Sequence, residues 1–122
     1  MLSTALIVCW LVASAPASPC SQPAAERNRL SDEAQGGEYT LRRVEFVGLT
    51  YTRDHILRER MTPIINEGDL FTRAKLARSL RAMSRVGTIY PLRLADVDVR
   101  LTRSTREVDI AICFRQRPRR RR

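Results

Sequence analysis

The sequence predicts an α+β fold, a two-layer βααββ sandwich in which a three-stranded sheet carries two helices on one face. Three short segments alternate apolar and polar residues, as half-buried strands do, and two others have apolar residues at helical spacing. The order along the chain is strand, helix, helix, strand, strand. Because each element has one apolar face, placing both helices on the same side of the sheet buries all of these faces in two layers.

The three strands are predicted from apolar residues that alternate with charged or small ones. A glycine, Gly48, ends the first run, and the polar turn 102–106 separates the other two, which are expected to form a hairpin. The apolar residues are Leu41, Val44 and Phe46 in the first strand, Val97, Val99 and Leu101 in the second, and Val108, Ile110, Ile112 and Phe114 in the third.

The two helices are predicted between the first and second strands. Residues 52–54 offer capping oxygens ahead of a short helix that Pro63 ends, and Thr72 caps a longer helix that stops near Gly87. Their apolar faces comprise Ile56, Leu57 and Met61 in the first helix and Leu76, Leu80, Met83 and Val86 in the second.

The N-terminal region is predicted to be a signal peptide over residues 1–17. The run 2–17 is uncharged and mostly apolar, and it is shorter than the roughly 20 residues that cross a bilayer. Ala15-Pro16-Ala17 offers a cleavage site before Ser18. The absence of a lysine or arginine after Met1 keeps two alternatives open, an uncleaved anchor and a cytosolic protein with an apolar start.

The remainder divides into a spacer, a domain and a tail. Residues 18–38 are rich in Pro, Ala, Ser, Gln and Gly without a sustained period, which predicts a flexible linker. The periodic elements lie within a single domain at 39–117, and a disordered arginine tail is expected at 118–122.

Two cysteines remain after the predicted leader, and they are not expected to form a disulfide framework because they lie in different segments. Cys113 is interpreted as a small half-buried filler rather than a reactive thiol. Acylation of Cys20 as the first residue of a lipoprotein is an alternative, although Pro19 is unfavourable next to the bond that would be cleaved. No metal site is predicted, since the single histidine, His55, has no ligand partner at a suitable spacing.

The net charge is +9, and six of these charges lie in the last eight residues. As a polyanion-binding tail they would hold lipid or lipopolysaccharide phosphates, or nucleic acid if the chain is not exported; otherwise they form a solvated end without a fixed partner. The six are Arg115, Arg117, Arg119, Arg120, Arg121 and Arg122.

Catalysis is not predicted. His55 has no nucleophile motif nearby, and no glycine-rich phosphate loop is present, so neither a hydrolase triad nor a nucleotide site is indicated. Several acids alternate with arginines along the strands and are expected to be cross-strand charge pairs: Asp96, Asp98, Glu107 and Asp109.

Three segments give the chain a family resemblance over about 80 residues: Val44-Glu45-Phe46-Val47-Gly48, Glu67-Gly68-Asp69-Leu70-Phe71, and Leu80 through Gly87. With the βααββ order, they make it resemble a polypeptide-transport-associated (POTRA) domain, as in outer-membrane β-barrel assembly factors. The resemblance implies a non-enzymatic periplasmic module without cofactors, associated with the outer membrane.

The resemblance also implies a protein partner, either an outer-membrane barrel or an unfolded barrel client. Partners of this family add a strand beside an exposed sheet edge, and an open edge offers the unpaired backbone groups that such addition needs. The chain is too short for a barrel of its own and is expected to be an accessory subunit or a detached remnant. The expected peptide-binding edge is Val97, Asp98, Val99, Arg100 and Leu101.

Overall fold

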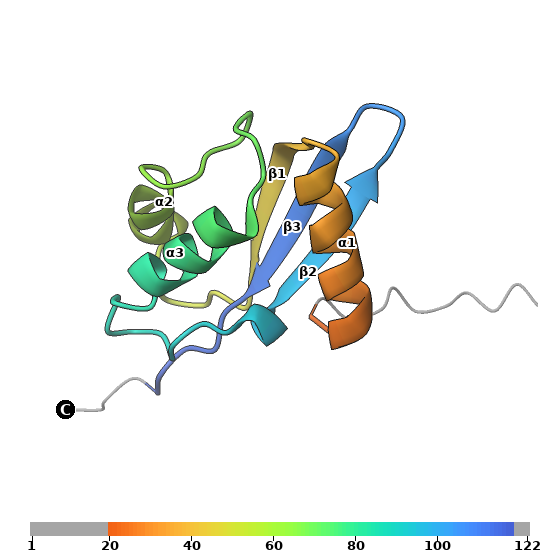
Figure 1. The fold of residues 1–122 in the computed structure, drawn as a ribbon. Helices are drawn as coiled ribbons and strands as arrows, with labels where there is room; N and C mark the ends of the chain where they lie inside the picture. Colours follow the sequence, from red (N-terminus) through yellow and green to blue (C-terminus); the bar gives the residue numbers. More distant parts are fainter. Residues whose placement is uncertain (1–19, 119–122) are drawn as a thin grey trace, which may run out of the picture.

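The computed structural model describes residues 20–118, and Figure 1 shows their fold. The elements are helix α1 (Ala24–Gly36), strand β1 (Thr40–Val47), helix α2 (Asp54–Met61), helix α3 (Arg73–Met83), the short 3₁₀ helix η1 (Leu94–Asp96), strand β2 (Val97–Thr102) and strand β3 (Glu107–Cys113).

The sheet has the order β1-β3-β2, so that the last strand in sequence is the central one. Strand β3 pairs in parallel with β1 and antiparallel with β2, which confirms the predicted hairpin. The α+β fold class is therefore confirmed, with β1 and β2 as the two outer strands of a mixed sheet.

The core lies between the sheet and the helices. Along β3 every second side chain is buried, and Val97 and Val99 of β2 are fully buried beside them. Helix α3 contributes Leu76, Leu80 and Met83, as its spacing predicts. The intervening strand residues, such as Asp98 and Ala111, lie on the opposite face of the sheet, which no helix of residues 20–118 covers.

The two predicted helices differ in how they begin. Thr72 caps α3 as expected, because its side chain accepts a hydrogen bond from the backbone N–H of Lys75 at 3.1 Å. The cap predicted for α2 is wrong: that helix begins without a side-chain cap. The hydroxyl of Thr52 instead bonds Thr88 and Gln116, which join this loop to the end of β3.

The prediction of a flexible linker over residues 18–38 is wrong for most of its length, because Ala24–Gly36 forms α1. This helix packs against β2 and α3 (Figure 1). Its buried apolar contribution is only Leu30 and Ala34, spaced i, i+4. So narrow an apolar stripe gives little periodic signal, and most helical stability comes from tertiary packing that the local sequence does not display.

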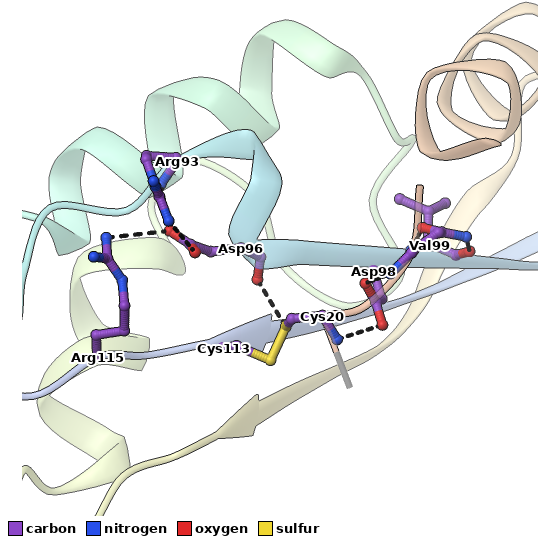
Figure 2. Close-up of a disulfide and its surroundings, with 8 residues drawn as sticks. Cys20, Arg93, Asp96, Asp98, Val99, Cys113 and Arg115 are labelled. Carbon is purple, nitrogen blue, oxygen red and sulfur yellow. Dashed lines mark hydrogen bonds and ion pairs between the residues drawn. A yellow bond between two sulfur atoms is a disulfide. The ribbon is translucent and has the colours of Figure 1, made fainter. Parts of the chain in front are cut away.

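The expectation about the cysteines is also wrong. Cys20 and Cys113 form a disulfide, with their Cα atoms 6.1 Å apart across a sequence separation of 93. The two cysteines meet because the segment before α1 passes beside β2, close to the end of β3 (Figure 2). A sulfur held in this bond is not available for acylation, which removes the lipoprotein alternative for the disulfide-bonded chain.

Among residues 20–118, no helix is both long enough and apolar enough to span a membrane. The predicted leader lies outside the described residues, and so do Arg119–Arg122 of the predicted tail.

Candidate protein-interaction edge

Strand β2 presents one row of backbone groups away from the sheet. Both backbone groups of Val99 bond to a residue outside the sheet, so its N–H and C=O point away from β3. Because the backbone groups of an antiparallel strand alternate in direction, those of Val97 and Leu101 point the same way. The predicted peptide-binding residues, from Val97 to Leu101, therefore do lie on an outer strand.

A side chain covers the middle of this edge. The amide of Gln22 donates to the carbonyl oxygen of Val99 at 2.9 Å and accepts from the N–H of Val99 at 2.8 Å. These are the two bonds that a paired strand would make at this position. Gln22 thus imitates one residue of an added strand.

Asp98 holds the segment that carries Gln22. Its carboxylate accepts from the backbone N–H of Cys20 at 2.5 Å and from that of Gln22 at 3.4 Å, and the disulfide lies beside it (Figure 2). Asp98 forms no ion pair with any described residue, so the cross-strand pairing predicted for it is wrong. Asp109, by contrast, pairs with Arg42 on the neighbouring strand, as predicted, at 3.0 and 2.5 Å.

The two ends of the edge differ. The N–H of Val97 donates to the carbonyl oxygen of Leu94 in η1. The backbone of Leu101 has no hydrogen-bond partner outside the sheet among residues 20–118. The open end of the edge is therefore the one near the β2–β3 turn.

A groove of about 560 Å³ runs between α1 and this edge. Cationic, anionic and apolar side chains all line it. They are Ser21, Gln22, Pro23, Glu26, Arg29, Leu30, Asp98, Val99, Arg100, Leu101 and Arg103.

Side-chain contacts attach helix α1 on two sides, to the β2–β3 turn and to α3. The guanidinium of Arg103 donates to both carboxylate oxygens of Glu33, each at 3.0 Å, which joins α1 to the β2–β3 turn. This hydrogen bonding lowers the pKa of Glu33 and raises that of Arg103. On the other side, Asp32 pairs with Arg73 at 2.7 Å, and the side chain of Gln35 accepts from the first N–H of α3.

The outer edge of β1 is covered along most of its length. The connector before α3 bonds it by backbone groups: Gly68 N–H donates to Leu41, and Leu41 N–H donates to Asp69. Phe71 N–H donates to Tyr39, just before the strand. Further along, the N–H of Val44 donates to Glu67 at 3.3 Å, and Arg58 donates to the carbonyl oxygen of Val44 at 3.0 Å. Within residues 20–118, the connector bonds this edge by backbone groups, whereas β2 beyond Val97 receives no such bonds from a neighbouring segment.

The structure brings two of the predicted polyanion-binding arginines together around Tyr90. The guanidinium carbons of Arg115 and Arg117 lie 5.8 and 5.0 Å from its ring centre. Arg117 also donates to the carbonyl oxygen of Ile89, and Arg115 to that of Pro91. The other four, Arg119, Arg120, Arg121 and Arg122, lie outside the described residues.

The sequence gives no signal for the contributions of Cys20 and Gln22, which lie in the segment interpreted as linker. Their roles depend on contacts across more than 70 residues. His55 is exposed on α2, and no group of three or more candidate metal ligands occurs within residues 20–118.

Comparison with known proteins identifies a matching family. A family model for the POTRA domain, described as a surface antigen variable number repeat, matches residues 39–116. No curated protein matches the chain. The match covers most of the sequence and spans β1 through β3, the part that carries the predicted resemblance, whereas α1 and the disulfide-bonded Cys20 precede it. The chain therefore belongs to the POTRA family of polypeptide-transport-associated domains.

Proposed function

We propose that this protein is a non-enzymatic periplasmic module that scaffolds or chaperones polypeptides in outer-membrane protein assembly or secretion, by adding a strand at the outer edge of β2. Family membership supports a protein-interaction role in this process. The partner is an outer-membrane barrel or an unfolded barrel client, and binding requires no cofactor.

The proposal depends on a difference in how the outer backbone groups of β1 and β2 are covered. The connector and the Glu67 and Arg58 side chains cover β1, whereas one glutamine side chain covers β2 at a single residue. A peptide can pair with Leu101 first and then replace Gln22 at Val99. It then forms at least as many hydrogen bonds with the backbone of β2 as the Gln22 side chain loses. The groove between α1 and β2 receives its side chains.

Export is part of the proposal and has separate support. Disulfides persist in oxidising compartments and are rare in the cytosol. The Cys20–Cys113 bond therefore supports the predicted signal peptide at 1–17 and favours the periplasm over the cytosolic alternative.

The test is an amide-resolved NMR titration of the full chain with an extended peptide of alternating valine and threonine. We expect shifts in residues 97–101 and in the facing side of α1. Leu101→Pro removes an outward donor without removing a β2–β3 bond, and it should abolish these shifts. Leu101→Ala, which keeps the donor, is the matched control. Binding that survives Leu101→Pro unchanged would refute docking at this edge.

A polyanion-binding protein acting through its arginine tail is the alternative function. Deleting residues 119–122 leaves the described domain intact and removes four of the six arginines. We expect peptide binding to persist in this variant. If instead the full chain binds only anionic lipid vesicles, at low salt, and the deletion abolishes that binding, the tail is the functional element.

A further inference from the structure

Helix α1 contains an arginine, Arg27, that is largely buried. Arg27 is only 8% exposed, and its Nε atom has no hydrogen-bond partner among the described residues. Within residues 20–118, its guanidinium also forms no ion pair, although other arginines of the domain do, including Arg73 and Arg103. A buried charge is costly unless an opposite charge or hydrogen-bond acceptors compensate it.

Arg27 lines a small hollow between α1, the first turn of α3 and η1. Its volume is about 30 Å³, far below the roughly 300 Å³ or more of pockets for drug-sized ligands. Polar groups from α1 and α3 and two leucines surround it: Arg27, Asn28, Ser31, Arg73, Leu76 and Leu94.

The lining is suited to an anion. No acid is among its lining residues, Arg27 contributes a positive charge, and Asn28 and Ser31 offer neutral donors. The second arginine, Arg73, is already paired with Asp32. Leu76 is buried, whereas Leu94 is 43% exposed, so that one wall of the hollow is an apolar surface open to solvent.

We propose that this hollow binds a carboxylate of a partner polypeptide, with Arg27 as its principal donor. The planar guanidinium matches the two oxygens of a carboxylate, and the hollow is too small for a bulky ligand. Leu94 receives the aliphatic carbons next to the carboxylate. The carboxylate belongs either to an acidic side chain of the partner polypeptide or to the C-terminus of that partner. This inference rests on the proposed function as a protein-binding module.

The carboxylate site and the strand-addition groove are separate. They lie on different sides of α1 and have no lining residue in common. A peptide can therefore occupy either one alone, and the failure of one proposal can be distinguished from the failure of the other.

The test follows the Nε–H resonance of Arg27 by NMR in the full chain at pH 7. Acetate is titrated against chloride at equal ionic strength, with inorganic phosphate in a parallel experiment. We expect a saturable shift with acetate. No shift beyond that in chloride, or a shift with phosphate alone, would overturn the proposal of a carboxylate site.

Two peptides distinguish the sources of the carboxylate. One is N-acetyl-Ala-Glu-Ala with an amidated end, and the other is N-acetyl-Ala-Ala-Leu with a free carboxylate. At least one should move the Arg27 resonance at lower concentration than acetate does, because Leu94 adds an apolar contact. If neither peptide acts below the acetate concentration, a partner polypeptide is not the ligand. Backbone shifts in residues 97–101 are recorded in the same spectra and report on the strand-addition edge independently.

Arg27→Met removes the charge but preserves an elongated side chain. We expect it to reduce the affinity for whichever of the two peptides binds the wild type more tightly, on the order of tenfold or more. In buffer containing only chloride, its midpoint of thermal unfolding should equal or exceed that of the wild type, because the uncompensated charge is gone. Arg78→Met, an exposed change on α3, is the matched control and should bind normally. Unchanged affinity in Arg27→Met would refute the site.

Discussion

At the residue scale, single side chains replace missing strands at both edges of the sheet. Gln22 supplies the donor and the acceptor to Val99 on β2, whereas Glu67 and Arg58 divide the same two tasks at Val44 on β1. The edge backbone groups are thus satisfied by a neutral amide on β2 and by two opposite charges on β1, because Arg58 and Glu67 form an ion pair at 3.8 Å. The amide is the simpler to displace, because its removal leaves no charge without a partner.

Gln22→Ala tests the covering of the edge. The N–H of Val99 loses its acceptor, so its hydrogen exchange should become faster, and the free energy of unfolding should fall by roughly 0.5–1.5 kcal/mol per lost bond. Glu26→Ala, in the same groove, is the control because its side chain bonds no group of β2. Unchanged protection of the Val99 amide would contradict the role assigned to Gln22.

Gly48 and Gly68 form a matched pair for a second residue-scale prediction. Both have positive φ, 87° and 95°. A Cβ at Gly48 would lie 2.6 Å from the carbonyl oxygen of Phe114, whereas, apart from its chain neighbours, no part of residues 20–118 lies within 4 Å of one at Gly68. Gly68→Ala should cost about 1–2 kcal/mol from the left-handed backbone alone. Gly48→Ala should cost measurably more in urea unfolding, and equal losses would show that the contact with Phe114 relaxes freely.

At the element scale, predictability depended on how much of an element's stabilisation its own sequence displays. Helix α3 has buried residues at i, i+4 and i+7 and a threonine cap, and it was predicted. Helix α1 buries Leu30 and Ala34, with Arg27 and Ser31 beside them, and depends on Glu33, Asp32 and Gln35 reaching other elements. Those contacts are visible only in three dimensions. Neither the hollow beside Arg27 nor the contribution of α1 and Gln22 to the β2 edge could therefore be predicted.

The attachment of α1 to the β2–β3 turn should depend on pH. Arg103 lowers the pKa of Glu33 below its unfolded value, so this contact stabilises the fold fully above the usual glutamate pKa and is lost as pH falls through the lowered one. Urea unfolding of the wild type and of Glu33→Gln should therefore differ at pH 7 and converge in acid. A difference that stays constant down to the acid limit would exclude Glu33 as the titrating group.

At the scale of the whole molecule, the disulfide closes nearly the full described chain. It joins Cys20, ahead of α1, to Cys113, at the end of the central strand, and so holds the segment with Gln22 against the edge where we propose that partners bind. The same bond that stabilises the domain therefore restricts access to its binding edge. Stability and binding are expected to change in opposite directions when it is removed.

The last prediction concerns Cys20→Ser combined with Cys113→Ser. Both the variant and its reference carry Cys9→Ser, which prevents alternative pairing. In the chain-entropy treatment, a loop of this length contributes about 4–5 kcal/mol, and measured values are commonly about 2–4, so urea unfolding should show a loss in that range. Affinity for the valine–threonine peptide should rise, because Gln22 is no longer held over Val99. Lower stability with lower affinity would mean that the segment 20–22 helps to form the binding edge instead of covering it.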